Sequence, residues 1–166
     1  FNRLPRPTLA QKLDGTRAFF RALNAMGITG VSDPGGYNLE IADYEPLFQL
    51  WRERQLTVRV RYSLSAPRRD HELDDFKTLT QTRPMGAGDE WLRFNGIGEN
   101  VTWGLYNNDS PSDAQKEQFY AVLRWAVSQD MTATFHWHND RPVHHLDRKS
   151  TRLNSSHIPL SRMPSS

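Results

Sequence analysis

The spacing of hydrophobic residues divides the chain into alternating helices and strands. In four segments the apolar residues recur every three or four positions, which is typical of a helix with one buried face. Between them lie short apolar runs, continuous or alternating with polar residues, as in buried strands. We therefore expect helices over residues 8–26, 43–51 and 70–82 and from Ser112 onward, and strands over residues 28–32, 56–64, 91–99 and 131–136.

Local signals fix some of the expected helix ends. Ser112 followed by Gln115 forms a capping box, and Asp43 is the expected cap of the second helix, with Pro46 in its first turn. Helices and strands that alternate along a chain favour parallel strands joined by helical crossovers. The pattern therefore predicts the α/β class.

One strand carries charge where a parallel sheet is normally covered. Arg59 and Arg61 occupy the second face of the expected strand 56–64. Parallel sheets are usually buried on both faces, so these side chains conflict with the pattern. Either this face looks into a polar cavity, or the strand lies at an edge of the sheet.

Composition changes this picture little. The length of 166 residues suits one domain, and 37% hydrophobic with 24% charged residues is typical of a soluble globular protein. Cysteine is absent, so a disulfide scaffold and a thiolate metal site are excluded, and any metal must be held by His, Asp or Glu. No apolar run is long enough to span a membrane.

The positive net charge of +2 belongs to the last twenty residues. Arg148, Lys149, Arg152 and Arg162 stand there against Asp147 alone, so residues 1–146 carry almost no net charge. This tail is rich in Ser and lacks periodicity, so we expect disorder. It also closely resembles a translated sequencing adapter, and we interpret residues 147–166 as an artefact, the alternative being a natural flexible tail.

The start of the chain has neither an initiator Met nor a signal peptide. We therefore interpret residues 1–146 as an internal piece of a longer protein. The compartment stays open, with the cytoplasm favoured. The body offers no basic footprint for nucleic acid, so a nucleic-acid binder would rest on the tail alone.

Four of the six histidines fall within residues 136–145. A histidine at the carboxyl end of a parallel strand projects into the crevice where such folds bind ligands, and neutral imidazole is a good zinc ligand. His136 is therefore a metal candidate, the alternative being a hydrogen-bonded rim residue. His138, two positions on, is expected at the rim.

Three stretches together resemble a known family. They are residues 25–33 (AMGITGVSD), the strand segment ending at Arg61 (LTVRVR) and the pattern from His136 through Asp140 to Leu146 (HxxNDRxVxxL). In order and spacing they are similar to the central part of the metal-dependent amidohydrolase superfamily, in its amidohydrolase 3 branch. The resemblance covers nearly all of residues 8–146.

The resemblance implies a partial (β/α)8 barrel of about four βα units with a divalent metal, zinc in our interpretation, at the carboxyl ends of the strands. His136 falls on the family's fifth-strand histidine, and Glu99 lies at the end of the fourth strand as a possible ligand. Asp140 matches a family aspartate, although Asn139 replaces the usual glycine. The family's other ligands would lie outside this sequence.

Simpler roles remain open for the same carboxylates. The alternative for Glu99 is an ordinary carboxylate on a glycine-rich turn. Asp33 and Asp140 are more readily interpreted as acceptors that fix loops near the site than as catalytic groups. We therefore name no catalytic residue, and only His136 and Glu99 as metal ligands.

The function implied by the resemblance is hydrolysis of amide or related C–N bonds of a small molecule by metal-activated water. Four βα units cannot close a barrel, which needs about 250 residues. We therefore expect open edges, an apolar interior face, poor solubility and no activity in isolation. The alternative function is a small non-catalytic α/β domain that binds a ligand or a protein.

Overall fold

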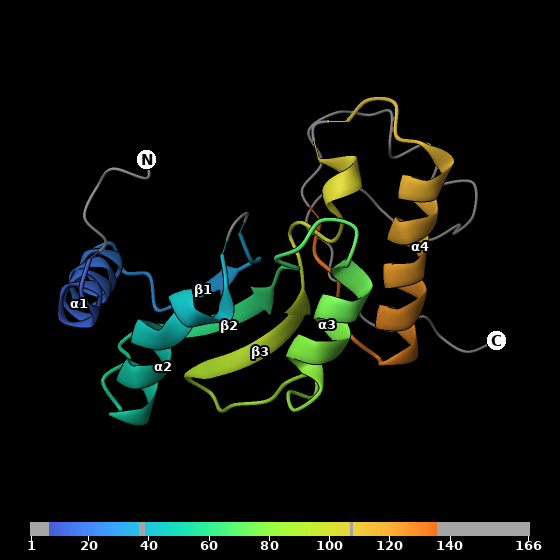
Figure 1. Cartoon of the computed structure of the whole chain (residues 1–166). Coiled ribbons are helices and arrows are strands. Elements are labelled where there is room, and N and C mark those ends of the chain that lie inside the picture. The colour runs from blue at the N-terminus through green and yellow to red at the C-terminus, as the bar shows by residue number, and fades with distance from the viewer. Residues whose placement is uncertain (1–6, 37–38, 107, 136–166) are drawn as a thin grey trace.

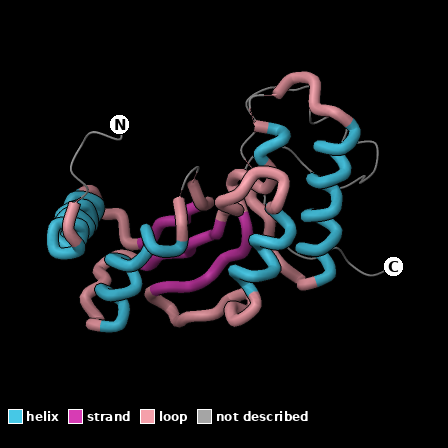
Figure 2. The backbone as a smooth tube through the Cα atoms, viewed as in Figure 1, coloured by secondary structure: helices cyan, strands magenta, loops and turns pink. Residues whose placement is uncertain are grey.

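The computed structural model describes residues 7–36, 39–106 and 108–135, and its centre is a parallel sheet (Figure 1). Its strands lie in chain order, β1 (Gly30–Asp33), β2 (Arg59–Leu64) and β3 (Leu92–Ile97), so β2 is the central strand. Helices separate the strands along the chain, and Figure 2 shows the alternation. The α/β class predicted from the sequence is thus confirmed, as an open sheet.

Two helices begin at capping boxes, of which the one at Ser112 was predicted from the sequence and the one at Thr8 was not. α1 (Leu9–Ala25) follows Thr8, and α4 (Asp113–Ser128) follows Ser112. In each helix the cap hydroxyl accepts a hydrogen bond from the N3 amide, and the N3 glutamine accepts one from the cap amide. These reciprocal bonds satisfy backbone donors that a helix start otherwise leaves free.

The start of the second helix differs from the prediction. A 3-10 turn, η1 (Ile41–Tyr44), precedes α2 (Glu45–Arg52), and the N-cap of α2 is Tyr44 rather than Asp43. The Asp43 carboxylate instead accepts a hydrogen bond from the Glu40 amide, 3.0 Å away, and so stabilises the 3-10 turn. Asp43 is therefore the N3 residue of the 3-10 turn, whose N-cap is Glu40, and not the cap of α2.

The helices pack on one face of the sheet. Val60 and Tyr62 of β2 and Leu92 and Phe94 of β3 are all at most 4% exposed and form the centre of the core. The Tyr62 ring packs against Phe48 of α2, with 5.5 Å between centroids. In Figure 1, α2 and α3 (Glu72–Thr80) lie across this face; α1 packs on α2, and α4 packs on α3.

The expected fourth strand is reduced to a single bridge in the part of the chain that the structure describes. Ala133 pairs in parallel with Ile97, through hydrogen bonds from the Ile97 amide to the Thr132 carbonyl and from the Thr134 amide to the Ile97 carbonyl. Gly96 makes this approach possible, because a Cβ there would fall 2.0 Å from the Thr132 oxygen. The segment thus continues the parallel order beyond β3.

The second face of the sheet contradicts two expectations. The edge interpretation of Arg59 and Arg61 is wrong, because β2 lies between β1 and β3. The expected apolar interior face is also wrong. Ser32, Arg59 and Arg93 are exposed there and Arg61 is half-buried, so the strand positions facing away from α2 are polar.

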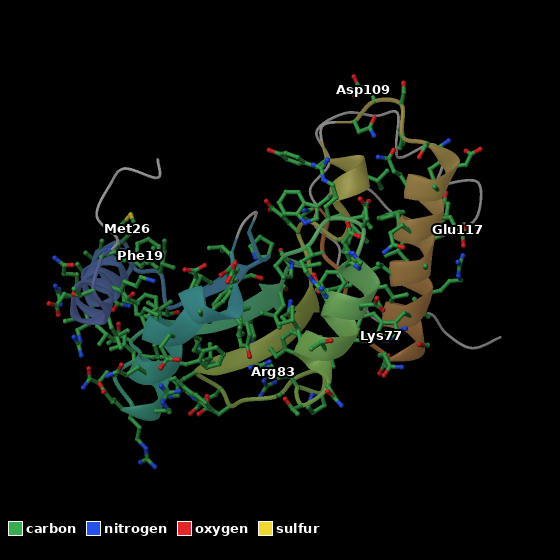
Figure 3. The ribbon with its side chains drawn as sticks, viewed as in Figure 1. Phe19, Met26, Lys77, Arg83, Asp109 and Glu117 are labelled. Atoms are coloured by element: carbon green, nitrogen blue, oxygen red, sulfur yellow. The ribbon has the colours of Figure 1, made fainter. Side chains whose placement is uncertain are left out.

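The two most exposed large apolar side chains of the described residues lie at α1. Phe19 of α1 is 58% exposed, and Met26, the C-cap residue directly after α1, is 67% exposed (Figure 3). Of the described helices, none is both long enough and apolar enough to cross a membrane. The domain division at residues 146 and 147 concerns residues outside the described ranges and stays a prediction.

Candidate active site

The carboxyl ends of the strands meet at Gly98, directly after β3. The Ser65 hydroxyl, after β2, donates a hydrogen bond to the Gly98 carbonyl oxygen, and the Gly98 amide donates to the Leu64 carbonyl at 3.1 Å. A Cβ on Gly98 would fall 2.4 Å from the Thr134 oxygen. Glycine is therefore required where three strand ends and the Ala133 segment converge.

Asp33 ends β1 at the same edge of the sheet. Its Oδ1 accepts a hydrogen bond from the Gly35 amide at 2.9 Å, which holds the loop that follows. The Tyr44 hydroxyl lies beside it and donates to the Ser63 carbonyl at 3.3 Å. Burial first, and the negative charge of Asp33 second, raise the pKa of Tyr44, so its phenol stays protonated.

Asp33 and Tyr44 also line a groove of about 530 Å3 between α1, β1 and α2. Its remaining walls are mainly apolar, with Phe19, Leu47 and Val60 among them. A groove with an apolar lining and a few polar groups at one end is suited to a small ligand that carries a polar head.

Glu99 follows Gly98 and is half-buried. Because Gly98 contacts Thr134, the backbone next to Glu99 lies against the segment that leads into His136. His136 and Asp140 themselves lie outside the described residues, as do His138 and the tail. The structure therefore brings together the chain positions next to Glu99 and His136, and it places Asp33 at the same edge on the far side of β2.

Three buried polar atoms in the described part of the chain have no hydrogen-bond partner. They are Ser63 Oγ in β2, and Asn100 Nδ2 and Thr102 Oγ1 in the loop after β3. Buried polar atoms are nearly always paired, so unpaired ones call for an explanation such as a bound water, an ion or a functional role. All three atoms lie toward the carboxyl end of the sheet, in β2 or in the loop after β3.

Sequence reasoning missed Tyr44, Ser63 and Ser65 at this edge. The two serines follow the expected pattern of polar residues near the end of a strand, and this signal could have singled them out. No such signal exists for Tyr44, because its hydroxyl reaches the site from a 3-10 turn whose position depends on the packing of α2.

The described residues do not form a complete metal site. Among residues 7–36, 39–106 and 108–135, no three His, Asp or Glu side chains come close enough to hold an ion. Asp33 is already bonded to the Gly35 amide. This part of the chain thus supplies Glu99 at the expected edge, and the second expected ligand, His136, lies outside the described residues.

Comparison with known proteins decides the family. A model of the amidohydrolase family matches residues 1–148, which is most of the chain. The chain belongs to the amidohydrolase family. No curated protein and no solved structure shows a significant match. Amidohydrolases hydrolyse C–N bonds of small, amide-like molecules and are commonly metal-dependent, so membership implies a hydrolase.

Proposed function

We propose that this amidohydrolase chain is part of a (β/α)8 barrel that hydrolyses amide or related C–N bonds of a small molecule. In this proposal His136 and Glu99 bind a divalent metal, zinc by preference, together with ligands that lie outside this sequence. When bound, such a metal lowers the pKa of a water molecule and polarises the carbonyl group under attack. The chain alone would then be inactive.

The observation that carries the proposal is the junction at Gly98. It places the backbone beside Glu99 against the segment that leads into His136, at the carboxyl ends of parallel strands. Ligands of α/β folds bind at this edge, and in barrels the active site is formed by the loops that follow the strands. The unpaired buried atoms of Ser63 and Asn100 lie at the same end.

The chain's own residues have supporting roles in this proposal. The Ser65 hydroxyl and the close backbone contacts at Gly98 fix the direction in which the chain leaves β3, and hence the start of the Glu99 loop. Asp33 and the protonated Tyr44 form a polar end to the groove beside β1, which suits the polar head of a substrate.

The function is tested with the protein encoded by the whole reading frame of the source gene. Its release of amine from N-acyl substrates is measured before and after chelation, in the wild type, in His136→Asn and in His71→Asn. We expect activity that depends on metal and is lost only in His136→Asn, because His71 lies at the N-cap of α3. Unchanged turnover in His136→Asn would overturn the proposal.

A further inference from the structure

Glu99 belongs to a short loop that is fixed at both of its ends. At one end, Gly98 lies against the backbone of Thr134, since a Cβ there would fall 2.4 Å from the Thr134 carbonyl oxygen. At the other end begins the 3-10 turn η2 (Trp103–Leu105), which Figure 1 shows in yellow beside α4. Residues 99–102 span these two fixed points, so the placement of the Glu99 side chain depends on both.

The second fixed point is held by Glu72, in the first turn of α3. Glu72 Oε1 accepts a hydrogen bond from the Trp103 amide at 2.8 Å, and Oε2 accepts one from Gln118 Nε2 of α4 at 3.3 Å. The Trp103 indole donates to the Ala66 carbonyl, in the loop after β2, at 3.0 Å. Trp103 is thus tied to the loop after β2 and, through Glu72, to α3 and α4.

Glu72 is a carboxylate in the interior of the protein. It is 1% exposed and forms no salt bridge with a cationic side chain of the described residues. A buried carboxylate is costly unless hydrogen bonds stabilise its charge, and a hydrogen bond to a charged acceptor is stronger than one between neutral groups. The contact therefore restricts where the Trp103 backbone can lie.

Side chains of the loop between the two fixed points do less to hold it. Asn100 and Thr102 are at most 5% exposed, yet Asn100 Nδ2 and Thr102 Oγ1 have no hydrogen-bond partner among the described residues. We propose that Glu72 is a positioning residue for the metal centre: it fixes the Trp103 end of the loop and thereby holds Glu99 where it can bind the metal. This inference rests on the proposed function.

The test is a calorimetric zinc titration of the metal-free protein encoded by the whole reading frame. We expect Glu72→Ala to bind zinc about tenfold more weakly than the wild type, the usual effect of losing a group that orients a metal ligand. Glu72→Gln keeps an oxygen that can accept from the Trp103 amide and an end that can pair with the Gln118 amide group. It should therefore bind zinc within about twofold of the wild type.

Asp75→Ala is the matched control. Asp75 is also a buried carboxylate of α3, 4% exposed, but it accepts hydrogen bonds from Arg68 and not from the loop that carries Glu99. This variant should lower the urea midpoint of unfolding, as Glu72→Ala does, and keep zinc affinity within about twofold of the wild type. Equal losses of zinc affinity in the two variants would overturn the proposal, because they would indicate general destabilisation.

A double variant tests whether Glu72 acts through Glu99. If it does, Glu72→Ala/Glu99→Gln binds zinc no more weakly than Glu99→Gln alone, because no ligand is left to misplace. Glu72→Asp, which shortens the side chain, repeats the test if Glu72→Ala does not fold. Losses that multiply in the double variant would overturn the proposal, as would wild-type affinity in Glu72→Ala alongside a loss in His136→Ala. Wild-type affinity in His136→Ala would instead overturn the proposed function itself.

Discussion

Gly35 and Gly98 are in direct backbone contact across the carboxyl edge of the sheet. A Cβ on Gly35 would fall 2.1 Å from the Gly98 carbonyl oxygen and 2.9 Å from Ser65 Oγ, and Gly35 has a φ of +81°. The loops after β1 and β3 can therefore approach this closely only with glycine at position 35. This contact holds the edge at which we place the active site.

We expect Gly35→Ala to lower the free energy of unfolding by about 2–4 kcal/mol, since it combines a left-handed backbone with steric overlap. Gly86→Ala is the matched control, because Gly86 has a φ of +80° but no atom within 4 Å of its Cβ position. It should cost only about 1 kcal/mol. Urea unfolding measures both, and equal losses would show that the Gly35–Gly98 contact is not tight.

Glu72 is a buried carboxylate that joins three elements. It is 1% exposed and accepts hydrogen bonds from the Trp103 amide at 2.8 Å and from Gln118 Nε2 at 3.3 Å. Glu72→Ala would leave these donors unsatisfied in the interior.

We expect Glu72→Ala to lower the free energy of unfolding by about 1–3 kcal/mol in a urea titration. Asp74→Ala is the control, because Asp74 lies in the same first turn of α3 but is exposed. It should cost no more than about 1 kcal/mol through the helix dipole. A larger loss in Asp74→Ala than in Glu72→Ala would contradict this account.

Asp89 makes stability depend on pH in the acid range. Hydrogen bonds from the Leu92 amide first, and from the Trp51 indole second, lower the pKa of Asp89. A carboxyl whose pKa is lower in the folded state stabilises the fold above its unfolded pKa and loses this contribution as the pH falls through the folded one.

We therefore expect Asp89→Asn to be less stable than the wild type at pH 7, with the difference shrinking below about pH 4, where the unfolded carboxyl titrates. Urea unfolding across this range checks it. Glu90→Gln, at the exposed neighbouring position, should follow the wild-type curve. A difference that widens as the pH falls would contradict the assigned shift.

Arg93 lies beside Arg61, and adjacent like charges on one face of a sheet repel each other. Since Arg93 forms no ion pair with a carboxylate of the described residues, Arg93→Gln should raise the free energy of unfolding by a few tenths of a kcal/mol at low salt. The gain should vanish at high salt through screening. A salt-independent gain would point to a cause other than charge.

Much of the fold could be predicted from local pattern. Caps such as Ser112 act within one turn of their own helix, so the sequence around them suffices to place a helix start. The alternation of helices and strands likewise predicts a parallel sheet. Periodicity does not show which strands lie next to each other. The central position of β2 is therefore seen only in the strand order of the structure.

The site was less predictable, because it depends on contacts between distant segments. The approach of Gly35 to Gly98 and the reach of Tyr44 to Ser63 join residues far apart in the chain, and neither leaves a local spacing. Glu99 could be named only through the family resemblance. Arg59 and Arg61 indicated a polar second face in the sequence. The resemblance to a barrel family nevertheless predicted an apolar interior face.

Our central proposal is that the carboxyl edge of this sheet forms part of a metal centre that includes His136. Calorimetric zinc titration of the metal-free protein encoded by the whole reading frame, which would hold the other proposed ligands, tests it most directly, with His136→Ala compared with His71→Ala. We expect the wild type and His71→Ala to bind zinc with equal affinity, and His136→Ala about tenfold or more weakly, because it lacks one ligand. Equal zinc affinity in all three proteins would contradict the claim.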